Sequence, residues 1–193
     1  MEPKEKEQIL AIQKGEPSLY SELISAHKNR IFGTLLSVLR NTQDAEDLTQ
    51  EVFLKAYRNI TRFEFKSSFY TWLYRIAINS AIDFQRKHKK MLKVSIDENK
   101  GGLDVLMKEA VNPKDSHYLL GFTPEQHELH AVLTASIQEL DIDHRSILQM
   151  REVEELSYAE IAKILGIKVG TVMSRLFHAR KKVREKLRQS EVL

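Results

Sequence analysis

Apolar residues recur at steps of three and four positions along much of the chain, the spacing that places them on one face of an α-helix. The longest of these stripes predicts a helix between residues 68 and 87. It consists of Phe69, Trp72, Leu73, Ile76, Ala77, Ser80 and Phe84. A shorter stripe predicts a second helix over residues 44–57. The domain formed by residues 1–92 is therefore expected to be all-helical.

The C-terminal part of the chain shows two short helical patterns separated by a turn. Ser157 has the position of an N-cap, and Glu160, three residues later, completes a capping box. The apolar face of this first helix consists of Ile161, Ala162 and Leu165. Gly166 suits a tight turn because it lacks a Cβ atom, and Val172 is placed to pack the second helix against the first. The pattern over residues 156–187 predicts a helix-turn-helix, a DNA-binding fold.

Residues 93–122, between these two regions, show no sustained periodicity. The segment is more acidic than basic, contains Gly and Pro, and is too long for an ordinary connection within one domain. Its end is marked by Thr123 as an N-cap, Pro124 at the first helical position and Gln126 closing a capping box. We therefore expect an all-α protein in which two small helical domains are joined by a flexible acidic linker.

Charge changes sign inside the predicted C-terminal domain, residues 123–193. Residues 131–160 carry two Lys or Arg against seven Asp or Glu, whereas residues 161–193 carry nine against two. The change coincides with the helix-turn-helix and places positive charge on its second helix, where contacts to DNA phosphates would form. The alternative explanation is a solvated helical face whose cations suit the helix C-terminus.

Composition narrows the class of protein further. The 193-residue chain has no cysteine, which excludes disulfides and cysteine metal sites and fits a reducing cytoplasm. Its N-terminus is charged and no stretch is apolar and long enough to cross a membrane, so we expect a cytoplasmic protein without membrane insertion. The net charge of +3 is too small to indicate a partner.

The predicted helix over residues 44–57 is acidic on its exposed side. Its apolar face consists of Ala45, Leu48 and Val52. The side chains away from that face are Asp47, Gln50, Glu51 and Leu54. Because DNA phosphates would repel such a surface, it is better suited to a basic protein partner. The alternative is a solvated helix surface without a partner.

The predicted helix over residues 68–87 carries aromatic and basic side chains beside its apolar stripe, and a basic run follows at residues 86–90. Rings and cations on one helix suit single-stranded nucleic acid, because bases stack on rings and cations follow the backbone. The side chains interpreted in this way are Tyr70, Tyr74 and Asn79. Those expected in the core instead are Phe69, Leu73 and Phe84.

Three motifs follow one another in the order and register of a known family. They are DAEDLTQEVFLKAY, then F-x-x-x-S-x-F-Y-T-W-L-Y-R-I-A-x-N, then LSYAEIAKILGI-x-VGTV-x-SRL-x-x-AR. The chain resembles an extracytoplasmic-function (ECF) sigma factor, the small two-domain class of sigma-70 transcription initiation factor in bacteria. The resemblance covers nearly the whole chain outside the linker. It implies a protein without enzyme activity or cofactor that binds core RNA polymerase, recognises promoter −35 and −10 elements and opens the −10 region.

The resemblance implies roles for individual residues of the first two motifs. The surface that docks on the clamp helices of core polymerase is matched by Asp44, Asp47, Gln50, Glu51 and Phe53. The loop and helix that capture a base flipped from the −10 element are matched by Phe63, Phe65, Lys66, Ser67, Ser68, Tyr70, Arg75, Asn79, Arg86 and Lys87. Stacking on a ring and hydrogen bonds to base edges offset the cost of extruding the base, so opening needs no ATP.

The third motif implies contact with the −35 element through the helix-turn-helix. The matching residues are Ser157, Lys168, Thr171, Ser174, Arg175, Phe177, His178, Arg180 and Lys181. Met173 stands where the family usually has Lys or Arg, His178 where Arg is common, and Lys168 replaces a frequent proline. Neither Met nor His grips guanine through two hydrogen bonds as Arg does, so the family's usual −35 sequence is not expected to apply unchanged.

The resemblance also implies partners beyond polymerase and promoter DNA. Sigma factors of this class are commonly held inactive by an anti-sigma factor that covers the polymerase-binding and DNA-binding faces, and we expect such a partner. The acidic linker is expected to occupy the positively charged path later taken by nascent RNA. Shortening residues 95–120 is then expected to impair initiation more than core binding.

Two other classes of protein compete with this interpretation. A response-regulator-type transcription factor also has a helix-turn-helix of the form L-S-x-x-E-I-A-x-x-L-G-I. It should carry a phosphoacceptor α/β domain as well, whereas residues 1–92 show helical periodicity. A zinc enzyme using His117, His127 and His130 would lack the cysteines and the H-E-x-x-H pattern typical of zinc sites.

Overall fold

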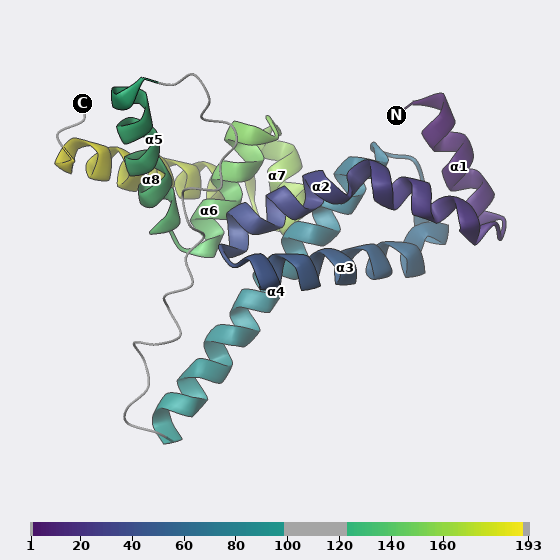
Figure 1. Ribbon diagram of the computed structural model, residues 1–193, viewed down its shortest axis with the longest axis horizontal. Helices are drawn as coiled ribbons and strands as arrows, with labels where there is room; N and C mark the ends of the chain where they lie inside the picture. Colours follow the sequence, from purple (N-terminus) through teal and green to yellow (C-terminus); the bar gives the residue numbers. More distant parts are fainter. Residues whose placement is uncertain (1, 99–122, 191–193) are drawn as a thin grey trace. The chain divides into compact units, whose positions relative to one another are not determined.

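The computed structural model describes residues 2–98 and 123–190, and every regular element in these two ranges is helical (Figure 1). The all-α class predicted from the sequence is confirmed. Contacts divide the chain into two units, residues 1–102 and 103–193. The first unit contains α1 Pro3–Gln13, the 3-10 turn η1 Pro17–Leu19, α2 Tyr20–Leu39, α3 Thr42–Asn59, the 3-10 turn η2 Ile60–Arg62 and α4 Phe69–Glu98. The second contains α5 Pro124–Gln138, α6 Ile142–Leu148, the π-helical turn η5 Gln149–Val153, α7 Tyr158–Leu165 and α8 Val169–Gln189.

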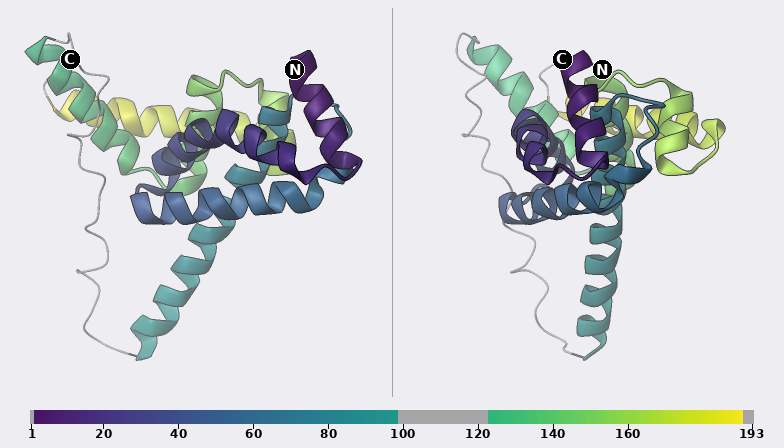
Figure 2. Two further views of the ribbon diagram at one scale, coloured as in Figure 1. Left: turned by 45° about the vertical axis from the view of Figure 1, so that its right-hand side comes forward. Right: turned by 90° about the vertical axis from the view of Figure 1, so that its right-hand side faces the viewer.

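In the first unit, α2, α3 and α4 pack against one another around an apolar core (Figures 1 and 2). The buried side chains of this core include Leu23, Ile31, Leu35, Val38, Ala45, Val52, Ala56, Phe69, Leu73 and Ile78. Helix α1 packs across one end of the three helices, against α2 and η2, with Ile9 and Ile12 buried. In both figures the second half of α4 extends beyond α2 and α3.

The turn between α2 and α3 is set by two adjacent residues. Arg40 ends α2 in the left-handed conformation, with a φ of 67°. Asn41 then caps α3, because its side-chain oxygen accepts a hydrogen bond of 2.8 Å from the backbone N–H of Asp44. This cap satisfies one of the N–H groups that the first turn of a helix leaves without a partner. The acidic residues of α3 follow directly.

Helix α4 is buried over a wider face than a single stripe predicts. Several expected core positions are only half-buried, namely Trp72, Ile76 and Phe84. Tyr74, which we expected to face nucleic acid, is 1% exposed, so that prediction is wrong. Ile78, also off the stripe, is buried too. The reason is that α4 contacts both α2 and α3, and each covers a different side of it.

The second unit contains the predicted helix-turn-helix in α7 and α8. Ser157 and Glu160 form the expected capping box, and Gly166 ends α7 with a left-handed φ of 65°. Val172 and Leu176 on α8 are buried against the preceding helices. The expected apolar face of α7 differs in one position, because Ile164 is buried and Leu165 is half-buried.

A buried arginine closes the corner between α5 and α6. Helix α5 begins with the predicted capping box of Thr123 and Gln126. At its other end the Arg145 guanidinium, on a residue 7% exposed, donates to three main-chain carbonyl oxygens. These belong to Ile137 at 3.4 Å, Gln138 at 3.1 Å and Leu140 at 2.5 Å. Carbonyls at the end of a helix lack partners within the helix, so these bonds stabilise the corner.

Part of the predicted linker can be compared with the structure. Helix α4 continues to Glu98, into the first part of the expected linker. The remainder, residues 99–122, lies outside the described residues, and His117 lies there too. No group of His, Asp or Glu in the described ranges is arranged to hold a metal ion. None of the helices in those ranges combines the length and apolar character that crossing a bilayer requires.

Candidate functional site

Helix α3 presents an acidic surface along its exposed side. Asp47 and Gln50 are exposed there, while Asp44 is half-buried in the first turn. The Glu51 carboxylate forms an ion pair of 2.7 Å with the Lys55 ammonium one turn further on. An amide N–H of Gln43 also donates to an oxygen of Asp47, at 3.2 Å. The structure thus brings the predicted polar docking residues together on one side of α3.

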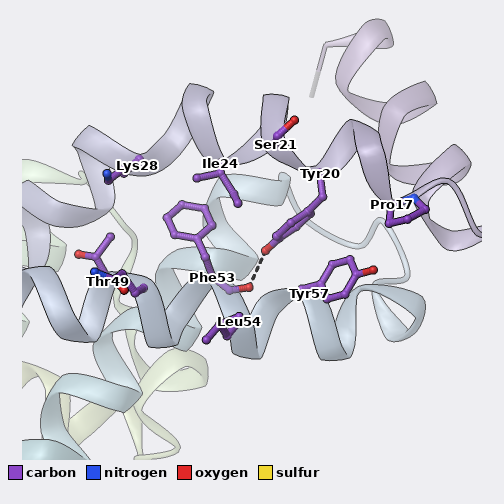
Figure 3. Close-up of a pocket in the computed structure, with 10 residues that line it drawn as sticks. Pro17, Tyr20, Ser21, Ile24, Lys28, Thr49, Phe53, Leu54 and Tyr57 are labelled. Carbon is purple, nitrogen blue, oxygen red and sulfur yellow. Dashed lines mark hydrogen bonds between the residues drawn. The ribbon is translucent and has the colours of Figure 1, made fainter.

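An apolar groove of about 460 Å³ runs between α2 and α3, next to this acidic surface (Figure 3). The residues that line it are Pro17, Tyr20, Ser21, Ile24, Lys28, Thr49, Gln50, Phe53, Leu54 and Tyr57. The Tyr20 hydroxyl donates a 2.7 Å hydrogen bond to the carbonyl oxygen of Phe53 and thereby joins the two helices. Burial raises the pKa of Tyr20, so this hydroxyl stays protonated and remains a donor.

The structure corrects the expected position of Phe53. Its side chain is 4% exposed and lies between α2 and α3, so it forms a wall of the groove and not part of the exposed acidic surface (Figure 3). The exposed apolar side chains at the groove are Leu54 and Tyr57, with exposures of 56% and 42%. The sequence did not indicate the other side of the groove, because its residues belong to η1 and α2, which precede α3 in the chain. One signal was present, since Leu54 is apolar but off the apolar stripe.

The loop between η2 and α4 is built around a cluster of aromatic rings. The ring of Phe63 lies 4.9 Å from that of Phe65, 5.9 Å from that of Phe69 and 5.2 Å from that of Trp72, measured between centroids. Phe63 is 4% exposed, so it supports the loop from inside and is not placed to meet a base directly as expected. Phe65 is half-buried and has a φ of 58°, in the left-handed region that residues with a Cβ rarely adopt.

The other loop residues form contacts within the loop or cap the start of α4. The Ser68 hydroxyl accepts a 3.0 Å bond from the backbone N–H of Thr71 and so acts as the N-cap of α4. The Ser67 hydroxyl donates to the carbonyl oxygen of Ser68 at 3.1 Å. Lys66 is exposed and its ammonium pairs with the Glu64 carboxylate. The hydrogen bond from Lys66 lowers the pKa of the Glu64 carboxyl. Among these predicted −10 residues, Lys66 is therefore the one that presents charge to solvent.

An open pocket of about 550 Å³ lies beside this loop, between α3, η2 and α4. Its lining consists of Lys55, Asn59, Arg62, Trp72, Arg75, Ile76 and Asn79. It therefore unites two predicted −10 residues, Arg75 and Asn79, with Trp72 and Ile76, which were expected in the core, and with Lys55, Asn59 and Arg62, which the sequence did not single out. Lys55, Asn59 and Arg62 come from α3 and η2, and the apolar stripe of α4 gives no indication that they lie beside it.

Contacts inside this pocket hold two of its polar groups in place. The Lys55 ammonium donates to the Ser80 hydroxyl at 3.1 Å, in addition to its ion pair with Glu51. An amide N–H of Asn59 donates to the carbonyl oxygen of Lys55 at 2.8 Å. Three cations, two amides and one indole ring thus converge on one space, which suits a planar polar ligand that carries negative charge.

Three further −10 candidates lie away from this pocket. Tyr70 is half-buried near α2, where the guanidinium carbon of Arg30 is 3.7 Å from the centroid of its ring. Its ring also lies 6.0 Å from that of His27. Arg86 and Lys87 are exposed further along α4. The side chains of Arg86 and Lys87 are thus open to solvent, whereas Tyr70 packs within the first unit.

In the second unit, α8 projects polar and apolar side chains into solvent. The exposed predicted −35 residues include Lys168, Thr171, Ser174 and His178. Three apolar side chains one turn apart are also exposed, namely Val169 at 43%, Met173 at 54% and Phe177 at 64%. This face is the one that can enter a DNA groove, because the opposite face of α8 is buried in the unit.

Several cations of this helix pair with acidic residues of their own unit. Arg180 bonds the Glu152 carboxylate at 2.6 Å, which raises the pKa of the arginine, and Arg175 pairs with Asp143 at 3.3 Å. Lys181 pairs with Glu185 one turn along α8, at 3.8 Å. The Ser157 hydroxyl donates to Glu160 at 2.7 Å within the capping box. The positive charge predicted for DNA contact is therefore partly balanced within the unit.

Comparison with known families and relatives bears on both units. The family model for Sigma-70 region 2 matches residues 23–91, and that for Sigma-70, region 4 matches residues 130–183. The ECF RNA polymerase sigma factor SigW of Bacillus subtilis is 33% identical over 194 residues, which cover 97% of this chain and 99% of SigW. The chain belongs to the ECF sigma factors.

This sigma factor is also similar to the RNA polymerase sigma-H factor of Pseudomonas aeruginosa. The two are 36% identical over 177 residues, which cover 89% of this chain and 88% of the relative. The fold matches a crystallised sigma factor, RpoE of Bartonella quintana in complex with the anti-sigma factor NepR. That match has a TM-score of 0.66 and 23% identity, and it covers 88% of this chain and 96% of RpoE. None of these findings favours the response-regulator alternative.

The two family models match different sets of helices. Region 2 spans most of α2 together with α3 and the first part of α4, and so includes the acidic surface and the pocket. Region 4 includes α7 and most of α8, the helix-turn-helix of the second unit. Helix α1 lies before the matched part of region 2, so its role has to be derived from its own contacts.

Proposed function

We propose that this sigma factor uses two faces of one helix for two steps of transcription initiation. The α2–α3 groove and the acidic surface of α3 bind core RNA polymerase, and the pocket beside the aromatic loop captures a promoter base. The observation that carries this proposal is that groove and pocket both include α3 but share no lining residue. Helix α3 thereby connects polymerase docking with promoter opening.

The docking face offers charge and apolar surface to a basic, partly apolar partner. Asp47 and Gln50 are exposed beside the groove, and Leu54 and Tyr57 add apolar area. Complementary charge orients the partner, while burial of the apolar side chains supplies affinity. The clamp helices of polymerase, implied by the family resemblance, fit this description.

The pocket has the chemistry of a nucleotide site. Lys55, Arg62 and Arg75 can neutralise phosphate, Asn79 can bond a base edge, and the Trp72 indole offers a stacking surface. Stacking of a base on an aromatic side chain contributes about 1–3 kcal/mol. Extruding a base costs a similar amount, a few kcal/mol, so binding in this pocket offsets the cost of opening without ATP.

We propose that α8 recognises the −35 element without an arginine that forms two hydrogen bonds to one guanine. Thr171, Ser174 and His178 offer hydrogen-bonding groups, and Met173 and Phe177 offer apolar contact to thymine methyl groups. Arg175, which the family resemblance places at the −35 element, is drawn toward Asp143. We therefore expect the −35 preference to depend on A·T pairs more than on guanine.

The remaining assignments follow from the family. The fold neighbour RpoE was crystallised with an anti-sigma factor, which supports an anti-sigma partner that covers the exposed surfaces of this protein as well. The sigma factor acts in the cytoplasm with polymerase and catalyses no reaction itself. The active site that makes RNA belongs to core polymerase.

The test of the proposed function is run-off transcription with purified core polymerase on fragments of the source genome. We expect core-dependent transcripts from a small set of fragments, and co-elution of the protein with core on a sizing column. Permanganate footprinting of those fragments should show unpaired thymines near the −10 position. No core complex and no core-dependent transcript from any fragment would contradict the proposal.

A further inference from the structure

We propose that helix α1 holds the base-capturing loop in its working conformation, with Gln13 as the positioning residue. This inference rests on the proposed function of the pocket and loop in region 2. It goes beyond that function because α1 lies outside the part of the chain that the region 2 family model matches.

A single side chain connects α1 to the start of the loop. The Gln13 amide nitrogen donates to the carbonyl oxygen of Ile60 at 2.7 Å and to that of Phe63 at 3.0 Å. These acceptors lie 47 and 50 residues away along the chain. An amide –NH₂ has two hydrogens, so both are used, one on the first residue of η2 and one on the residue that follows it. The same turn is closed from within by the backbone bond from Phe63 to Ile60, at 3.0 Å.

The position of this turn determines the position of a pocket wall. The Phe63 ring lies 5.2 Å from the Trp72 ring, and Trp72 lines the pocket. Phe63 is 4% exposed, so a shift of its backbone has to move its neighbours or leave a void. Gln13 is therefore coupled to the pocket through Phe63 and Trp72, without touching the pocket itself.

A second contact reaches the same loop from α1. The Lys6 ammonium lies 5.8 Å from the centroid of the Phe65 ring. Phe65 holds a φ of 58°, which residues with a Cβ rarely adopt unless surrounding contacts impose it. Helix α1 thus supports the loop at its first turn and again at its most constrained residue.

The anchoring of α1 does not depend on Gln13. Ile9 is fully buried and Ile12 is 6% exposed, and both pack into the first unit. Gln8 donates to Glu22 on α2 at 2.5 Å, and His27 bonds Glu5 at 2.8 Å. Removing the Gln13 amide should therefore leave α1 in place and free only the loop.

The experiment compares Gln13→Met with Gln8→Met in the full-length protein bound to core polymerase. Methionine keeps the length of glutamine but donates no hydrogen bond. Gln8→Met is the matched control, because it removes a bond from the same helix to α2 instead of the loop. The promoter is one found by run-off transcription, tested with its preferred −10 base and with each substitution at that position.

We expect Gln13→Met to reduce the preference for the correct −10 base at least fivefold and to slow opening of duplex promoter about tenfold. A template with a pre-melted −10 region should recover most of the opening defect. Core affinity should stay within about twofold, and Gln8→Met should retain full base preference. Unchanged base preference in Gln13→Met, or an equal loss in Gln8→Met, would overturn the inference.

Two further variants separate this inference from the proposed function and from a folding defect. Asn79→Ala removes a polar group of the pocket itself. If Asn79→Ala abolishes base preference and Gln13→Met does not, the pocket proposal stands and the role of α1 falls. If neither changes it, both fall. Gln13→Glu preserves the shape of the side chain but places carboxylate oxygens against two carbonyl oxygens, so it should reproduce the Gln13→Met result. Normal base preference in a folded Gln13→Glu protein would also overturn the inference.

Discussion

In the first unit the proposed groove and pocket are lined by residues of several elements, whereas in the second unit the proposed DNA contacts project from one helix. The pocket draws on α3, η2 and α4, and the groove on residues of two helices. Helix α8 instead buries one face and exposes the other, with Phe177 at 64% and its neighbour Leu176 at 1%. A hollow depends on how helices pack, while a projecting face can change without disturbing the fold. Specificity should therefore be easier to alter at the −35 contact than at the −10 pocket.

The largest expected effect tests this separation of faces on α8. Leu176→Ala should lower the free energy of unfolding by about 2–5 kcal/mol, because it leaves a cavity in the core of the second unit. Phe177→Ala should change it by less than about 0.5 kcal/mol yet weaken binding to the −35 duplex. Urea unfolding and fluorescence anisotropy measure the two effects. Equal destabilisation by both variants would show that α8 has no independent outer face.

The next effect concerns the acidic surface of the first unit. Asp47→Lys should weaken core binding about 100-fold, or about 2.7 kcal/mol, because it places a cation against a basic partner. Glu46→Lys is the matched control, since it makes the same charge change on the exposed residue before it. Titration of labelled core measures affinity, and circular dichroism checks that α3 stays helical. Similar affinities for the two variants would remove Asp47 from the docking surface.

A smaller effect is expected from one polar group of the pocket. Asn79→Ala should slow opening of duplex promoter by about 10- to 100-fold, equivalent to about 1–3 kcal/mol of lost base discrimination. Core binding should be unaffected, because groove and pocket share no residue. Asp83→Ala, one turn further along α4 and exposed, serves as the control. Permanganate reactivity reports opening, and parallel loss of core affinity would mean that the hollows are not separate.

The smallest effect concerns the charge balance of α8. Glu152→Gln removes the carboxylate that holds Arg180, and stability should fall by less than about 1 kcal/mol because the pair is exposed. The freed arginine should then contact phosphate, raising affinity for duplex DNA about two- to threefold and steepening its salt dependence by up to about one unit. Glu155→Gln is the control. An unchanged salt slope would mean that Arg180 does not reach the backbone.

The same contrast explains what could be predicted from the sequence. Stripes, caps and Gly166 predicted α3, α4, the start of α5 and the helix-turn-helix, because these depend on neighbours three or four residues apart. The −35 candidates on α8 were given by the family resemblance and not by periodicity. Tyr74 was misplaced because α4 is covered by two helices, and a single stripe describes packing against one.

Residues of the hollows were harder to predict for a related reason. Phe53 and Phe63 belong to the matching motifs, yet both are buried and shape a surface from beneath. Asn59, Arg62 and Trp72 lie together only because α3, η2 and α4 pack against one another. The carbonyl groups that accept hydrogen bonds from Gln13 lie 47 and 50 residues away along the chain. Local spacing carries no information about such contacts, so they emerge only from the tertiary structure.

The buried Arg145 has a consequence for the response of the second unit to salt. Its guanidinium is buried and its acceptors are main-chain carbonyls, so dissolved salt screens these hydrogen bonds little. The exposed pairs of α8, such as Lys186 with Glu139, weaken as ionic strength rises. A rise in salt concentration should therefore loosen the charged surface of the second unit while its scaffold stays intact. The second unit can therefore keep its shape at an ionic strength that weakens its surface ion pairs.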